Sequence, residues 1–185
     1  LKEAKVFDGE SDALLNFDTN KSSIEALGYL VPNYLIRRAL FKKAAQIENV
    51  TIQYDISVED VKTSSNVANI VLSNKMTIKS KLIVAADSRF SEIRRKMGVP
   101  SMMKDFSKVM IIARVSHENS HNQTALECFK YGHTLALLPL NGNVSSVVLT
   151  VSTNQSEDIL KMDKEKFCDF ASEGFNNKLG SMKQI

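Results

Sequence analysis

The sequence contains few of the residues on which several classes of site depend. Among its 185 residues there are no tryptophans, three prolines, three histidines and two cysteines. The cysteines, Cys128 and Cys168, lie in apolar surroundings and lack the paired spacing of a zinc site or a redox motif. We therefore expect both thiols to be reduced core residues, as in a cytosolic compartment, and we expect no metal site.

Strong charge and long apolar runs are also missing. The formal net charge is +3, which does not indicate nucleic acid without a clustered basic surface and a motif. No apolar run approaches the ~20 residues of a membrane-spanning helix. The histidines show no pattern for metal or triad chemistry, and the polar loop around His117 and His121 predicts that both are exposed.

The first third of the chain has an ordinary pattern of strands and one clear helix. Residues 4–8 and 13–18 predict two strands joined as a hairpin by residues 9–12. A further strand is expected over residues 27–31, followed by a helix that begins near Asn33 and ends at Asn49. The helix has an apolar stripe made of Leu35, Ile36, Ala39, Leu40, Ala44 and Ile47.

The rest of the chain predicts mostly strands. Three are expected in the middle, and the last two of them should pair through a turn at residues 73–75. Four more should form an antiparallel sheet, and a helix capped by Asp163 should then run to Gly180. The expected strands are residues 50–55, 67–72, 79–86, 108–116, 125–130, 134–140 and 145–152.

The most informative stretch is residues 81–100. Residues 82–86 are a continuous apolar run, typical of a strand covered on both faces. Asp87 follows at the end of that run, where open α/β sheets place their ligands. Signals for a short basic helix come next, so we expect a ligand-facing turn; the signals are Ser88, Ser91, Arg94, Arg95, Lys96, Gly98 and Pro100.

Several segments, in order, carry a resemblance to a known family. They are ALGYLV at 26–31, LIVAADSRFSEIR at 82–94, ECF at 127–129, LALLPL at 135–140, DKEKFC at 163–168 and KLG at 178–180. The second resembles the pattern L-[IV]-V-[GA]-A-D-G-x-x-S-x-[VI]-R of the flavin-dependent aromatic-ring hydroxylases. Together the segments are most similar to the hydroxylases of ubiquinone biosynthesis.

The resemblance implies a fold and a reaction. The fold is a mixed α/β (α+β) one, like para-hydroxybenzoate hydroxylase, with an antiparallel substrate-domain sheet and part of an FAD-binding βαβ layer. The cofactor is FAD, the reductant NAD(P)H, and the substrates are dioxygen and a polyprenylated phenol. Since the cofactor performs the oxygen chemistry, no catalytic residue is predicted. The expected location is cytoplasmic, with peripheral contact to a membrane or to other ubiquinone-pathway proteins, and nucleic acid is not an expected partner.

The resemblance also divides the chain. Residues 1–31 and 101–155 correspond to substrate-domain strands, residues 32–100 to the partial FAD layer, and residues 156–185 to a C-terminal helix and a truncated end. Because G-x-G-x-x-G and G-D-A-x-H are absent from the sequence, and the chain opens on Leu1, we expect it to be the central piece of a longer enzyme. Two alternatives stay open: a non-catalytic binding or assembly module, and a hydroxylase of another aromatic compound.

Eight residues are expected to contact the cofactor or the substrate. A structural role stays open for several of them: Asp87 as a helix cap, Asn33 as a helix start, Arg37 and Arg94 as surface charges. Being two residues apart on a strand, Glu127 and Phe129 should share a face, although Phe129 also suits a buried position. The cofactor set is Asp87, Ser88, Asn33, Arg37 and Arg94, and the substrate set is Glu127, Phe129 and Pro139.

Two departures from the family pattern affect these sites. Ser88 stands where the family has glycine, and serine tolerates a positive φ less well, so we expect the backbone at the flavin edge to differ. His133 and Thr134 replace a Gly-Pro pair before Leu135, which predicts a change in the strand that enters the substrate site.

Overall fold

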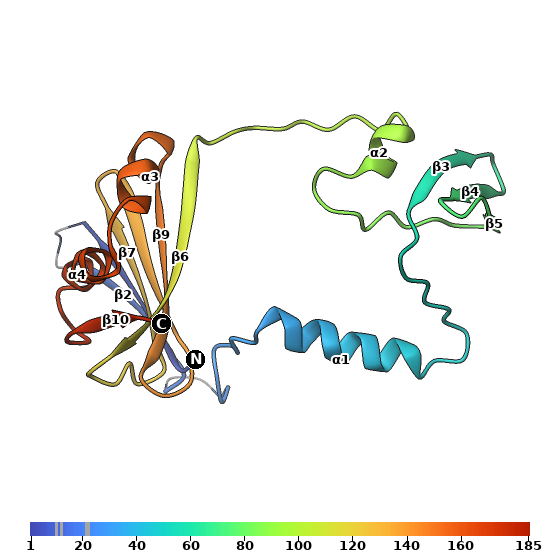
Figure 1. The fold of residues 1–185 in the computed structure, drawn as a ribbon. Helices are drawn as coiled ribbons and strands as arrows, with labels where there is room; N and C mark the ends of the chain where they lie inside the picture. The colour runs from blue at the N-terminus through green and yellow to red at the C-terminus, as the bar shows by residue number, and fades with distance from the viewer. Residues whose placement is uncertain (10, 12, 21–22) are drawn as a thin grey trace. The chain divides into compact units, whose positions relative to one another are not determined.

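The computed structural model describes residues 1–9, 11, 13–20 and 23–185. These residues form two compact units, and each contains a sheet (Figure 1). The large unit comprises Leu1–Pro32 and Asp105–Ile185, and the small unit comprises Asn33–Lys104. The predicted hairpin connection at residues 9–12 includes two positions that lie outside the described residues.

The large unit is built on a seven-stranded sheet of order β10-β6-β9-β8-β7-β1-β2. Neighbouring strands are antiparallel except for β1 and β7, which are parallel. The hairpin strands and the four later β segments are confirmed, and β10 was not predicted. The strands are β1 (Glu3–Asp8), β2 (Leu14–Asp18), β6 (Lys108–His117), β7 (Thr124–Lys130), β8 (His133–Pro139), β9 (Val144–Ser152) and β10 (Met182–Gln184).

One face of this sheet forms the core with helix α4 (Lys164–Gly174). Along β9, Ser145, Val147, Leu149 and Val151 are buried, and the residues between them are half-buried, as expected for a sheet covered mainly on one side. Helix α4 contributes the core side chains Phe167, Cys168 and Ala171, and Phe175, which follows the helix, contributes another. Both cysteines are free and buried, which confirms their prediction as core residues.

Helix α4 begins as predicted and ends earlier. Asp163 is the N-cap, and its Oδ1 accepts a hydrogen bond from the Lys166 amide at 2.8 Å. The prediction that the helix continues to Gly180 is wrong, because Asn176 and Asn177 adopt positive φ of 55° and 54° and thereby end it. Asparagine tolerates this conformation well. A second helix, α3 (Thr153–Leu160), precedes it and was not predicted.

The small unit contains helix α1 (Asn33–Ala45), an antiparallel β3-β4-β5 sheet and the short helix α2 (Glu92–Lys96). Its strands are β3 (Val58–Thr63), β4 (Ala68–Leu72) and β5 (Thr77–Ser80). The predicted hairpin is confirmed, because β4 pairs with β5. In the turn between them Lys75 has a φ of 68°, and its main-chain amide donates to the Leu72 carbonyl oxygen at 2.8 Å. The start of α1 at Asn33 is also confirmed, although none of its side chains is buried.

Two predicted strands, residues 27–31 and 50–55, are wrong, and the predicted strand at 79–86 is confirmed only as far as Ser80. Residues 27–31, 50–55 and 82–86 have irregular backbone, and β3 lies at residues that were not predicted as a strand. An apolar run becomes a strand when a neighbouring strand satisfies its backbone and covers its side chains. Leu82 and Val84 are instead 77% and 79% exposed, and neither pairs with a strand among the described residues. Asp87 therefore does not follow a strand here.

The prediction that His117 and His121 are exposed is also wrong. His117 is buried at the end of β6, with Nδ1 2.8 Å from the Asn119 carbonyl oxygen and Nε2 2.9 Å from Ser145 Oγ. His121 is half-buried, and its ring lies edge-on to that of His117 at 5.6 Å. The β6 register puts His117 beside Met182 and on the core face, which the local polar sequence does not reveal.

This burial predicts acid sensitivity. Desolvation, opposed by the Asn119 carbonyl and aided by His121, lowers the pKa of His117 below its ordinary value of 6.5. Because the folded protein disfavours the protonated ring, His117 supports the fold above about pH 6.5, where the ring is neutral. This contribution to stability is lost as the pH falls and the ring takes up a proton. We expect the free energy of unfolding of the wild type to drop more steeply between pH 7 and 5 than that of His117→Gln, measured by urea denaturation. Equal slopes would contradict the assignment.

Candidate functional site

The predicted cofactor turn, residues 87–91, forms a capped entry to α2. Asp87 Oδ2 accepts from the Ile93 amide at 3.1 Å, and Ser91 Oγ accepts from the Arg94 amide at 3.0 Å. Hydrogen bonds from the Ser91 side chain and then from the Ile93 amide hold the pKa of Asp87 below its usual range. The carboxyl is exposed, so Asp87 caps the helix as a charged group that remains accessible to solvent.

Ser88 adopts a backbone conformation that favours glycine. Its φ is 89°, where the absence of a Cβ would remove a steric cost. Serine thus occupies a glycine-type conformation at this position, and the two caps hold the turn on its helical side. Unfavourable φ values of this kind concentrate at functional sites.

Ser88→Gly is accordingly expected to stabilise the small unit by about 0.5–1 kcal/mol. Glycine relieves the steric cost of the positive φ, but part of this gain is lost because a glycine has more conformational entropy in the unfolded chain. Ser88→Ala is the matched control, because it removes the hydroxyl and keeps the Cβ. Thermal unfolding of the three proteins measures the effect. A gain in Ser88→Ala equal to that in Ser88→Gly would show that the hydroxyl, rather than φ, is unfavourable.

The remaining cofactor candidates lie in the same unit. Arg94 is half-buried in α2, and its Nη1 donates to the Val99 carbonyl at 2.7 Å, which ties the helix end to the following chain. Asn33 and Arg37 lie exposed on the first turns of α1. The local fold thus brings Asp87, Ser88 and Arg94 into one segment, and leaves the α1 residues on a separate element.

The substrate candidates lie on the seven-stranded sheet, on two different faces. Glu127 and Phe129 share the face opposite α4, here called the open face, which confirms that they lie on one side of β7. Phe129 is 47% exposed and is not a core residue. Pro139 is buried in the alternation of Leu135 and Leu137, so it faces the core and cannot share a surface with Glu127.

Glu127 is the one charged residue in a row that crosses the open face. Residues in register on neighbouring strands lie side by side on the same face. The row is Leu15, Val6, Glu127, Ala136, Val148 and Ile112. Glu127 is half-buried, and burial raises the pKa of its carboxyl above the ordinary 4.5. Perturbed carboxyls in apolar surroundings are candidates for function.

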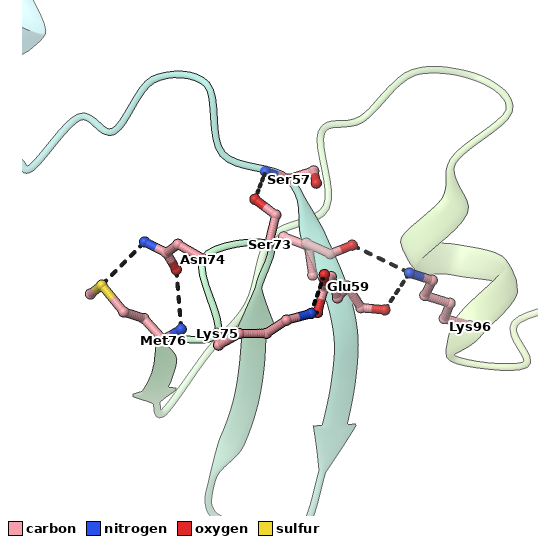
Figure 2. Close-up of polar contacts among 8 residues, drawn as sticks. Ser57, Glu59, Ser73, Asn74, Lys75, Met76 and Lys96 are labelled. Atoms are coloured by element: carbon pink, nitrogen blue, oxygen red, sulfur yellow. Dashed lines mark hydrogen bonds and ion pairs between the residues drawn. The ribbon is translucent and has the colours of Figure 1, made fainter.

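The structure adds a residue that the sequence gives no sign of. Lys96 Nζ donates to the carbonyl oxygens of Val58 at 3.3 Å and Glu59 at 2.5 Å. Figure 2 shows the Lys96 side chain extending from α2 toward β3, where Glu59 lies. The acceptors are main-chain carbonyls 37 and 38 residues away in the sequence, and every residue type has such a carbonyl. The sequence therefore cannot predict this contact, and only the fold identifies it.

Two kinds of site receive no support from the described part of the chain. Its His, Cys, Asp and Glu side chains form no cluster of three or more suited to a metal ion. No described helix is both long enough and apolar enough to cross a bilayer.

Curated proteins of known name match the whole chain, although no family model matches it. The chain is 39% identical to ubiquinone hydroxylase UbiM of Neisseria meningitidis over all of its length, which is 41% of that protein. It is 26% identical to ubiquinone hydroxylase UbiL of Rhodospirillum rubrum, covering 43% of it. It is 31% identical over 92% of its length to the ubiquinone biosynthesis monooxygenase COQ6 of Danio rerio, covering 37% of that protein. The chain thus spans about two fifths of the length of these relatives.

Solved structures show the same fold at low sequence identity. The chain superposes over its full length on 55% of PqsL, a probable FAD-dependent monooxygenase from Pseudomonas aeruginosa, with a TM-score of 0.76 and 16% identity. It superposes over 99% of its length on 36% of the flavin-dependent halogenase CmlS, with a TM-score of 0.71 and 16% identity. The chain is therefore similar over all or nearly all of its length to proteins named as ubiquinone hydroxylases and monooxygenases, and it shares its mixed α/β fold with part of PqsL.

Proposed function

We propose that this chain is the part of an FAD-dependent, NAD(P)H-using monooxygenase that provides its substrate sheet and one flavin-contacting turn. The proposed reaction hydroxylates a polyprenylated phenol in ubiquinone biosynthesis. The observation that carries the proposal is the apolar row across the open face, with Glu127 as its one charged side chain. The names of the homologous hydroxylases favour this substrate class over other aromatic compounds.

The turn at residues 87–91 fits the cofactor. The glycine-type φ of Ser88 suits a close approach between main chain and ligand, and the exposed Asp87 carboxylate can accept from a ribose hydroxyl. Arg94, and on α1 Arg37 with Asn33, would supply charge and hydrogen bonds to the phosphates. When bound, FAD would supply the redox chemistry: it would pass the two electrons of NAD(P)H to dioxygen, so that one oxygen atom enters the ring and the other leaves as water.

The open face would hold the ring and exclude water. Phe129 offers an aromatic surface beside Glu127, and offset or edge-on packing of two rings stabilises such a contact. The Glu127 carboxyl, whose pKa burial raises, can accept the phenolic proton or share it. Exposed apolar residues on β6, Met110 and Ile112, extend this surface and suit a prenyl tail.

We further propose that residues 1–31 and 101–155 belong to the substrate domain and residues 32–100 to the flavin layer, as the resemblance implies. A lipid-tailed substrate also requires contact with a membrane surface or with a partner that presents the lipid. Flotation of the protein with liposomes, with and without the prenylated phenol, tests that requirement.

The proposed function is tested in a strain from which the gene that encodes this chain is deleted. We expect a prenylated phenol lacking one hydroxyl to accumulate, and the purified gene product to be yellow with FAD that NAD(P)H reduces. A gene product that stays colourless with added FAD would contradict the enzyme and favour the binding module. Unchanged quinone intermediates in the deletion strain would point to a different aromatic substrate.

A further inference from the structure

Helix α2 needs support from the rest of the small unit. With five residues from Glu92 to Lys96, it is far shorter than a helix that is stable alone. One support is apolar: α2 lies against β3, and Ile93 is buried. The other supports are polar and act at its two ends.

The first end of α2 is tied to the proposed flavin turn. Asp87 and Ser91 accept hydrogen bonds from the amides of Ile93 and Arg94, so the turn and the helix move as one segment. Whatever fixes α2 therefore also fixes Ser88 and the Asp87 carboxyl.

The last end of α2 is tied to β3 by a single side chain. Lys96 Nζ donates to the Val58 and Glu59 carbonyl oxygens at the start of β3. Hydrogen bonds from a charged donor are about twice as strong as neutral ones. Strand β3, which supplies the acceptors, is itself restrained. Lys75, in the β4–β5 turn, forms an ion pair with the Glu59 carboxylate (Figure 2), and its Nζ lies 2.8 Å from Glu59 Oε1.

We propose that Lys96 is a positioning residue for the cofactor: by clamping α2 to β3 it sets the position of the turn at residues 87–91. The inference rests on the proposed function, because it assumes that this turn contacts FAD. Lys96 itself lies at the far end of α2 from the turn and needs no contact with the cofactor.

The test compares three variants of the full gene product. Lys96→Met removes the clamp, Lys96→Arg retains a charged donor, and Arg95→Met removes the same charge from the adjacent exposed position of α2. We expect the FAD dissociation constant, from flavin fluorescence titration, to rise about tenfold in Lys96→Met, equivalent to ~1.4 kcal/mol. It should change less than about twofold in Lys96→Arg and Arg95→Met.

Hydrogen exchange without FAD separates this inference from the function on which it rests. The Ile93 and Arg94 amides should exchange faster in Lys96→Met than in Arg95→Met, whether or not FAD binds. Unchanged exchange, or equal losses of FAD affinity in Lys96→Met and Arg95→Met, would overturn the positioning role. A wild type that binds no FAD would overturn the proposed function and the cofactor role of Lys96 together, while the exchange comparison would still report on the clamp.

Discussion

Gly174→Ala is expected to destabilise the large unit by about 1–3 kcal/mol, the usual cost of overpacking a core. A Cβ at position 174 would lie 2.2 Å from Leu135 Cδ1 and 3.6 Å from Leu135 Cγ. Leu135 is fully buried and packs in the core that the sheet forms with α4, so moving its Cδ1 away from the new Cβ disturbs its packing there. Alanine normally favours a helix over glycine by about 1 kcal/mol, and here the clash reverses that sign.

Urea denaturation measures the effect, with Gly28→Ala as the control because a Cβ there meets nothing within 4 Å. The cause is tested by repeating Gly174→Ala in a Leu135→Ala background, where the contact atoms are gone. We expect the cost of Gly174→Ala to shrink by more than half in that background. A cost that persists unchanged would show that the helix end itself, rather than the Leu135 contact, requires glycine.

Glu127→Gln is expected to lower kcat/KM about 10- to 100-fold, the range for a lost hydrogen bond to a charged group. Glutamine keeps the shape of the side chain and a hydrogen-bonding carbonyl oxygen, but it cannot take up the phenolic proton. A conservative control is Glu157→Gln, because Glu157 lies exposed on α3. Steady-state oxidation of NAD(P)H coupled to product analysis measures both variants, and equal activity in both would contradict a role for Glu127.

The same substitution should raise stability, which distinguishes it from general damage. A raised carboxyl pKa means that folding disfavours the charged form, so Glu127 costs stability above about pH 4.5. Glu127→Gln should therefore unfold at a higher temperature than the wild type at pH 7, and this advantage should vanish toward pH 4. A functional side chain that costs stability is the expected compromise.

The sequence predicts well those elements whose stability comes from neighbours within the described chain. Strict alternation identifies β9, because one face of it packs on α4 and the other does not. Asp163 identifies the start of α4, because a cap is a local interaction. The run at residues 82–86 has an equally strong apolar pattern, but pairing in a parallel sheet is non-local and no described strand provides it.

The candidate site follows the same division. The shared face of Glu127 and Phe129 is a consequence of strand geometry, so two residue numbers are sufficient to predict it. The core-facing position of Pro139 depends on the register between β8 and its neighbours. A match to a family motif identifies the residue but does not say which face of the sheet it lies on. The Lys96 clamp depends on backbone acceptors in another element, for which no residue type is required.

We propose that this chain serves a flavin-dependent ring hydroxylation. The most direct test of this proposal is mass spectrometry of the product formed by the purified full-length gene product with FAD, NAD(P)H, a polyprenylated phenol and isotopically labelled dioxygen. We expect one labelled oxygen atom on the ring, with much less product from Glu127→Gln. Bound FAD that NAD(P)H reduces, without transfer of labelled oxygen to any phenol supplied, would contradict the claim.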